Sequence, residues 1–120
     1  MSQKFALIIE DDPKLAKIFS LALTSGDFAT ELINDGRTAL KQLKHLIPDV
    51  IVLDLHLPYV SGQEILWQIK QDDRLANTHV IIATADALLA EELESQADIV
   101  LLKPISVSQL KELAMRLAQV

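Results

Sequence analysis

The sequence contains no cysteine among its 120 residues, and only 4% of its residues are aromatic. The lack of cysteine excludes disulfide bonds, thiol catalysis and thiolate metal sites, and it is compatible with the cytoplasm. Basic residues are also few, because 11 lysines and arginines stand against 17 aspartates and glutamates, giving a formal net charge of −6. An acidic chain with few aromatics is a poor candidate for binding nucleic acid directly, since nucleic-acid phosphates attract basic surfaces.

Long apolar stretches are absent as well. The first apolar run, at 5–9, is followed at once by Glu10, Asp11 and Asp12, so it is too short and too acidic on its far side for a secretory signal. No run approaches the ~20 apolar residues of a membrane span. We therefore expect a cytoplasmic protein without contact to a membrane, and its length fits one domain over residues 1–120.

Five short runs, mostly rich in Ile, Val or Leu, predict β-strands. The run at 28–33 carries polar residues and suits an edge strand. The other four are expected to be buried on both faces, as strands of a parallel sheet are, and they lie at 5–9, 50–53, 80–83 and 99–102.

Apolar residues at helical spacing fill the segments between these runs. Asp12 before Pro13 predicts the N-cap of the first helix, Ser61 precedes another helix, and Gly26 suits a helix end. An Ala-, Leu- and Glu-rich segment at 86–95 predicts a further helix. Strand and helix thus alternate five times, which predicts an α/β, doubly wound (βα)₅ fold with helices on both faces of a parallel sheet. In the flavodoxin-like strand order 2-1-3-4-5, the first and third strands are neighbours.

Polar residues stand where the predicted strands end. Glu10 and Asp11 follow the first strand, Asp54 the third, Thr84 the fourth and Lys103 the fifth. Ligands of doubly wound sheets bind beyond these ends, where the strand order reverses, so the three carboxylates should meet there. Crowded carboxylates repel each other unless a cation joins them, and Mg²⁺, or Mn²⁺ in its place, suits their oxygen atoms. A carboxylate nucleophile, a metal, an ammonium group and a hydroxyl group together fit phosphoryl transfer.

These motifs, in this order and at this spacing, resemble the response regulator receiver domains of two-component signalling, the CheY-like family. The resemblance covers essentially the whole chain, and the matching segments are LIIEDD at 7–12, DGRTAL at 35–40, DVIVLDLHLP at 49–58, SG at 61–62, IATA at 82–85 and LLKP at 101–104. It implies a signalling switch that catalyses its own phosphorylation and dephosphorylation, not an enzyme acting on a separate substrate. A sensor histidine kinase or phosphotransfer protein would phosphorylate Asp54. An output domain, a downstream protein or a second copy of the chain would be the further partner.

The resemblance also implies how a metal would be held. Asp11 would bind Mg²⁺ directly together with the acceptor Asp54, and Glu10 would act mainly through a water molecule. The backbone carbonyl group of His56 would complete the protein's ligands, whereas the side chain of His56 is expected to be a solvated loop group.

The same resemblance assigns the phosphoryl group to Thr84 and Lys103, and it implies a cis peptide bond between Lys103 and Pro104. Val100 and Ile105 depart from the family's pattern, because these positions are often aromatic. Val100 therefore has no ring to swing inward after phosphorylation, and the usual aromatic switch is in doubt.

Two other functions fit parts of the pattern. A phosphatase of the haloacid-dehalogenase type also uses an aspartate nucleophile and Mg²⁺ on a parallel sheet. Such enzymes place a second aspartate two residues after the first, where this chain has His56, and the chain lacks their cap insertion. A pseudo-receiver would serve only as an interaction module without phosphorylation, but the presence of Asp54, Asp11, Thr84 and Lys103 disfavours that alternative.

Overall fold

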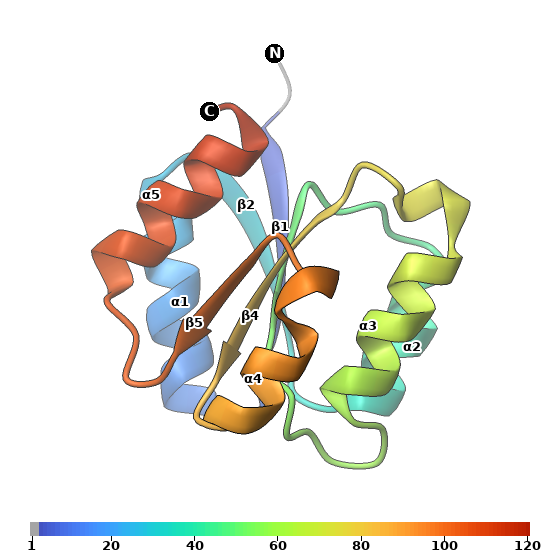
Figure 1. Cartoon of the computed structure of the whole chain (residues 1–120). Helices are drawn as coiled ribbons and strands as arrows, with labels where there is room; N and C mark the ends of the chain where they lie inside the picture. Colours follow the sequence, from blue (N-terminus) through green and yellow to red (C-terminus); the bar gives the residue numbers. More distant parts are fainter. Residues whose placement is uncertain (1–2) are drawn as a thin grey trace.

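The apolar runs form five parallel strands in the computed structural model, which describes residues 3–120 (Figure 1). The strands are β1 (Lys4–Ile9), β2 (Phe28–Ile33), β3 (Val50–Leu53), β4 (His79–Thr84) and β5 (Ile99–Leu102). Their order in the sheet is β2-β1-β3-β4-β5, which confirms the predicted order. Ile9 pairs with Leu53 at the ends of β1 and β3, so the residues that follow these two strands come side by side.

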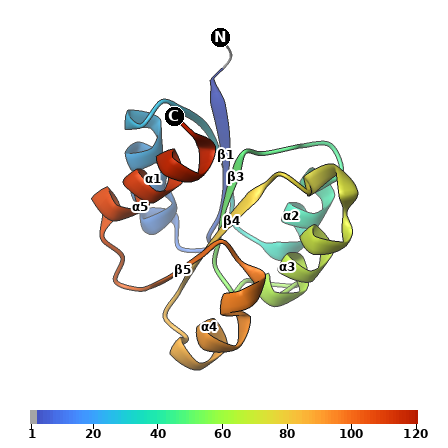
Figure 2. The same ribbon diagram turned by 45° about the horizontal axis from the view of Figure 1, so that its top comes forward.

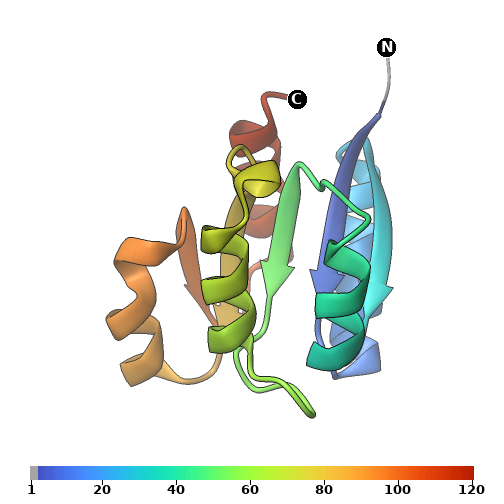
Figure 3. The same ribbon diagram turned by 90° about the vertical axis from the view of Figure 1, so that its right-hand side faces the viewer.

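In the described part of the chain, five α-helices alternate with the strands. The helices are α1 (Pro13–Ser25), α2 (Gly36–Leu43), α3 (Gly62–Gln71), α4 (Ala87–Leu93) and α5 (Val107–Ala118), and short 3₁₀ turns follow α3 and α4, namely η1 (Asp73–Leu75) and η2 (Glu94–Gln96). Figure 2 shows α1 beside α5, and Figure 3 shows α2, α3 and α4 on the other face of the sheet. Within residues 3–120, every helix is too short or too polar to cross a membrane.

The helix boundaries follow the predicted signals, with one difference. The Asp12 carboxylate accepts hydrogen bonds from the N–H groups of the second and third residues of α1, and Pro13 occupies the first helical position. The Ser61 hydroxyl group accepts one from the third residue of α3, and Gly26 ends α1. The helix predicted at 86–95 is shorter than expected, because Asp86 is its N-cap and the chain turns into a 3₁₀ helix at Glu94.

Two apolar layers form the core, one on each face of the sheet. Alternate side chains of a strand point to opposite faces, so Ala6 and Ile8 join the layer under α1 and α5, whereas Leu7 and Ile9 join the layer under α2 and α3. The neighbouring strand β3 is also buried along its whole length. Asp54 therefore extends from the most protected part of the sheet.

The strand β5 corrects one expectation. The apolar run at 99–102 predicted burial on both faces, but β5 lies at an edge of the sheet and none of its residues is fully buried. Leu102 is 51% exposed. An apolar run indicates a strand, but it does not reveal that the strand has a neighbour on one side only.

Two glycines let the loop between β3 and α3 lie close to neighbouring backbone. A Cβ atom at Gly62 would lie 2.1 Å from the carbonyl oxygen of Asp54, and one at Gly36 would lie 1.9 Å from the carbonyl oxygen of Val60. The limit at both positions is space, since neither glycine has a positive φ. The loop at 54–61 is thus packed against the starts of both α2 and α3.

We expect Gly62→Ala to destabilise the protein by about 3 kcal/mol, because backbone atoms must move to remove the clash with Asp54. Gly26→Ala is the matched control, since its added Cβ atom would meet only the flexible side chains of Met115 and Lys111, at 3.1 and 3.3 Å. Urea unfolding followed by circular dichroism measures both changes. If Gly62→Ala loses no more stability than Gly26→Ala, the close approach of Gly62 to the Asp54 backbone would be contradicted.

Candidate functional site

Three carboxylates gather where β1 and β3 end. Glu10 and Asp11 follow β1, Asp54 follows β3, and one carboxylate oxygen from each lies within 4.8 Å of the others. Glu10 and Asp54 are 1% and 5% exposed, whereas Asp11 is open to solvent. The N–H group of Asp54 donates to the carbonyl oxygen of Ile9 at 2.9 Å, which joins the two strand ends. The predicted meeting of these residues is confirmed.

The Lys103 ammonium group lies between two of these carboxylates. Its Nζ atom is 2.6 Å from Oε1 of Glu10 and 3.6 Å from Oδ2 of Asp54, so Glu10 is its nearer partner. The N–H group of Lys103 donates to the carbonyl oxygen of Thr84 at 2.8 Å, which fixes the end of β5 against β4. The Lys103–Pro104 peptide bond is cis, as the resemblance implied.

Burial and charge act against each other in this cluster. Burial raises the pKa of the Glu10 carboxyl group, and the charge of Asp54 adds to the rise, while Lys103 and the N–H group of Asp12 oppose it. Burial alone would lower the pKa of Lys103, but its hydrogen bond with Glu10 and the charge of Asp54 outweigh burial and raise that pKa. Lys103 thus stays charged. Three carboxylates and one ammonium group leave an excess of negative charge, which fits a hard divalent cation.

The two other predicted site residues lie beside this cluster, Thr84 at the end of β4 and His56 in the loop after β3. Thr84 is fully buried, and its hydroxyl oxygen accepts a hydrogen bond from the N–H group of Asp86 at 3.1 Å. The N–H group of His56 points to Oδ1 of Asp54 at the long distance of 3.4 Å. The backbone of His56 therefore lies beside Asp54, and the metal-binding role of its carbonyl group stays a prediction.

The His56 side chain is solvated, as expected, but it also has a partner. It is 66% exposed, and its Nε2 atom lies 3.0 Å from Oδ2 of Asp86. The pKa of Asp86 is lowered, first by the N–H group of Leu89 and then by His56. This contact links the loop after β3 to the N-cap of α4. This contact was not predicted, because the two residues are 30 positions apart along the chain and both are common in loops.

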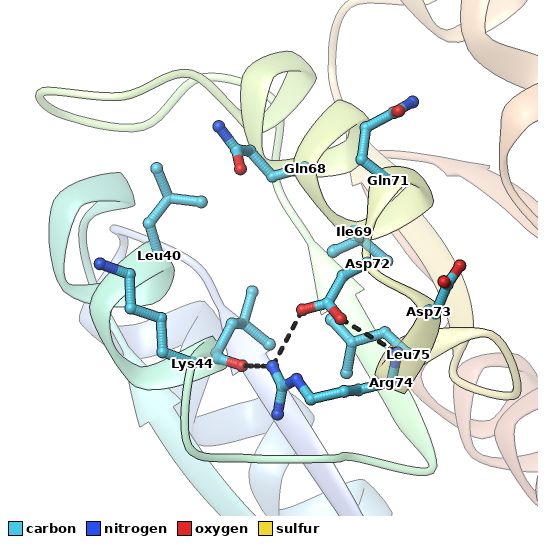
Figure 4. Close-up of a pocket in the computed structure, with 10 residues that line it drawn as sticks. Leu40, Lys44, Gln68, Ile69, Gln71, Asp72, Asp73, Arg74 and Leu75 are labelled. Atoms are coloured by element: carbon cyan, nitrogen blue, oxygen red, sulfur yellow. Dashed lines mark hydrogen bonds and ion pairs between the residues drawn. The ribbon is translucent and has the colours of Figure 1, made fainter.

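A separate cavity lies away from this cluster. It has a volume of about 670 Å³ and lies between the C-terminal halves of α2 and α3 (Figure 4). Leu43 and Ile69 provide apolar lining. The guanidinium group of Arg74 donates to the Leu43 carbonyl oxygen and to Asp72. Lys44 and Arg74 balance Asp72 and Asp73 in the lining, so this cavity has no excess of charge comparable to that around Asp54.

Comparison with known proteins identifies the family. A family model described as "Response regulator receiver domain" matches residues 6–115. The chain belongs to this family. The DNA-binding response regulator MtrA of Mycolicibacterium smegmatis is 32% identical over 104 residues, which cover 87% of this chain and 46% of MtrA. The response regulator ArlR of Staphylococcus epidermidis is 34% identical over 107 residues, with 87% and 48% covered. The chain spans about half the length of these curated relatives.

Solved structures agree with this assignment. The receiver domain of the Francisella response regulator 1452 is 29% identical, with a TM-score of 0.86 over 97% of both chains. The receiver domain of the sensor histidine kinase PA1611 from Pseudomonas aeruginosa shares the fold, with a TM-score of 0.87 and 23% identity over 99% of this chain and 100% of that one. That structure has a magnesium ion coordinated in its active-site cleft. The prediction of a response regulator receiver domain is thus confirmed. The matches do not favour a phosphatase of the haloacid-dehalogenase type.

We expect Lys103→Met to destabilise the metal-free protein by about 3 kcal/mol near pH 7.5, because Glu10 would remain buried without its cation. Folding raises the pKa of Glu10, so the folded state favours the protonated carboxyl group, and stability falls as pH rises through the folded-state pKa. Without Lys103 the pKa of Glu10 should rise further, because Lys103 lowers it. The loss of stability in Lys103→Met should therefore be smaller near pH 5, where the Glu10 carboxyl group is more often protonated.

Urea unfolding at the two pH values measures this difference. Lys17→Met is the control, since Lys17 is an exposed residue of α1 and its loss should change stability little at either pH. Equal destabilisation of Lys103→Met at both pH values would contradict the role of Lys103 as the counter-charge of Glu10.

Proposed function

We propose that a sensor histidine kinase or phosphotransfer protein phosphorylates this domain on Asp54 with the help of Mg²⁺. The observation that carries the proposal is the set of Glu10, Asp11 and Asp54 oxygens within 4.8 Å of one another, with the ammonium group of Lys103 among them. Phosphoryl transfer depends mainly on positioning and on neutralising charge. A carboxylate nucleophile beside an ammonium group and a cation site meets both needs.

The donor set suits Mg²⁺ or Mn²⁺, because all its atoms are hard oxygen ligands. Asp11 is exposed and would bind the ion directly with Asp54, whereas Glu10 already contacts Lys103 and would act through a water molecule. The carbonyl oxygen of His56 would be the remaining protein ligand. The ion would neutralise charge on the oxygens of the acceptor and of the phosphoryl group. The magnesium ion of the PA1611 receiver domain, which has the same fold, supports this choice.

Asp54, Lys103 and Thr84 would each have a separate role in the phosphoryl transfer. An oxygen of Asp54 attacks the phosphorus atom of a phosphohistidine donor, the P–N bond breaks, and the released imidazole keeps the electron pair and takes up a proton. Lys103, whose Nζ atom is 3.6 Å from Oδ2 of Asp54, is within reach of a phosphoryl oxygen bound there. Thr84 would turn its hydroxyl group from the N–H group of Asp86 to the phosphoryl group. That turn would release the backbone just before α4.

The response would reach an output domain or a downstream protein through α4 and β5. Val100 lies beside a groove of about 460 Å³ between these elements and has no ring to fill it, so a shift of the loop after Thr84 and of α4 would have to carry the signal. We also propose a cytoplasmic location, and pairing with a second copy is compatible with this surface. The name of MtrA includes DNA binding, but this domain is acidic, and we expect it not to bind nucleic acid itself.

We expect the wild-type protein to gain one phosphoryl group when it is incubated with a small phosphodonor and Mg²⁺, and Asp54→Asn to gain none, because an amide is a poor nucleophile. Intact-protein mass spectrometry measures the gain. Asp73→Asn is the control, since Asp73 is an exposed residue of η1, and it should be phosphorylated normally. Normal labelling of Asp54→Asn would place the acceptor elsewhere, and an unlabelled wild type would favour a pseudo-receiver.

We expect His56→Ala to shorten the lifetime of the phosphorylated state by about threefold to tenfold. The contact between His56 and Asp86 at 3.0 Å joins the two loops beside the acceptor, and its loss should give water easier access to the phosphoryl group. The decay of radiolabelled protein measures the lifetime. His45→Ala, at an exposed histidine of another loop, should leave it unchanged. An unchanged decay in His56→Ala would make its side chain a spectator.

A further inference from the structure

The loop that follows Asp54 contains a strained turn. The N–H group of Val60 donates to the carbonyl oxygen of Pro58 at 2.9 Å, and Tyr59 between them has a φ of 70°. A hydrogen bond between residues two apart, with a positive φ at the central residue, is typical of the rarer and strained form of γ-turn. A bulky residue seldom adopts a positive φ, because its Cβ atom crowds the backbone. Such a conformation persists only where surrounding contacts hold it.

The first residues of α2 provide these contacts. The N–H group of Gly36 donates to the same carbonyl oxygen of Pro58 at 3.0 Å, and Gly36 has no Cβ atom to collide with Val60. The guanidinium carbon of Arg37 lies 4.2 Å from the centre of the Tyr59 ring, which is a cation–π contact. The Tyr59 side chain is 73% exposed, so burial contributes little to holding the ring. The contact with Arg37 is therefore the side-chain interaction through which α2 can hold the ring.

The turn lies where it can affect the metal site. The loop is fixed at one end by the hydrogen bond from Asp54 to Ile9 and at the other by the N–H group of Gly62, which donates to the carbonyl oxygen of Leu55 at 2.9 Å. His56 lies between these fixed ends, and the turn is the part of the loop whose backbone is under strain. If the turn relaxes, the backbone of His56 would be held less firmly relative to Asp54.

We propose that Arg37 and Tyr59 are positioning residues, which hold this turn and thereby set the affinity of the site for its divalent cation. The inference rests on the proposed function, in which the carbonyl oxygen of His56 is a metal ligand. A site that is formed for only part of the time binds with an affinity reduced by that fraction. Loss of an exposed cation–π contact should therefore weaken Mg²⁺ binding by about two- to fivefold.

The direction of the change separates this proposal from simple electrostatics. Removing a positive charge near an acidic site should strengthen Mg²⁺ binding if only charge matters, whereas removing the contact with Tyr59 should weaken it. The dissociation constant is measured by isothermal titration calorimetry with MgCl₂ for wild type, Arg37→Ala and Lys41→Ala. Lys41 is an exposed lysine of the same helix and serves as the charge control. We expect weaker binding only in Arg37→Ala.

Variants at Tyr59 test the mechanism through coupling. Tyr59→Phe keeps the ring and should bind Mg²⁺ like wild type. Tyr59→Gly removes the strain along with the ring, because glycine adopts a positive φ readily, so Arg37→Ala should have no further effect in that background. Tyr59→Ala keeps the strain without the ring and should bind more weakly. Equal effects of Arg37→Ala with Tyr59 and with Gly at this position would overturn the proposal.

The remaining outcomes distinguish this inference from the proposed function. Asp11→Ala should abolish or greatly weaken the titration, and circular dichroism confirms that each variant is folded. If wild type itself does not bind Mg²⁺, the proposed function is overturned. If wild type binds, Asp11→Ala does not, and Arg37→Ala binds equally well or better, the proposed function stands and the positioning role of Arg37 and Tyr59 is overturned.

Discussion

The crowding of negative charge at the ends of two buried strands is the constraint on which the site depends. Parallel pairing of β1 with β3 brings Glu10 next to Asp54, and the apolar layers on both faces prevent the strands from moving apart. The repulsion cannot be relieved by separation, so it has to be balanced by positive charge. Lys103 supplies one such charge at 2.6 Å from Glu10. Whatever else binds must supply more positive charge or share the charge of Lys103.

Lys103 also connects the cluster of carboxylates to the rest of the domain. Lys103 is attached to β4 through the carbonyl oxygen of Thr84, and the hydroxyl group of Thr84 in turn holds the N–H group of Asp86. Asp86 caps α4 and contacts His56. A change in charge at Asp54 therefore acts on groups that already link both flanking loops and the start of α4. Charges interact more strongly in the protein interior than in water. A few redistributed hydrogen bonds therefore suffice to shift an equilibrium between two conformations of these loops.

The sequence predicted those features that depend on local pattern. Apolar runs gave the strands, the Asp12–Pro13 pair and Ser61 gave helix starts, and strand order brought the carboxylates together. It did not predict the contacts that depend on side-chain conformation between distant segments, such as the preference of Lys103 for Glu10 or the pairing of His56 with Asp86. The exposure of β5 was missed because its apolar residues resemble those of a central strand. The stacking of Arg37 on Tyr59 was missed because neither residue type is unusual at a loop or a helix start.

The acidic residues at the two ends of the strands are held in different ways. Where strands begin, aspartates also stand next to apolar runs, but each has a backbone donor: the Asp49 carboxylate accepts from the N–H group of Phe5 at 2.8 Å, and Asp98 accepts from that of Val80 at 2.7 Å. These hydrogen bonds satisfy the carboxylates and fix strand register, so no cation is needed. Where strands end, the backbone donors are farther away: the N–H group of Asp12 is 3.2 Å from Oε2 of Glu10, and that of His56 is 3.4 Å from Oδ1 of Asp54. The closest contact of Glu10 is the Lys103 ammonium group. Glu10 and Asp54, which are buried where strands end, therefore keep oxygen lone pairs that are not used in short hydrogen bonds to the backbone. The same residue type is therefore structural where strands begin, while where strands end it keeps the acceptor capacity that the proposed function requires.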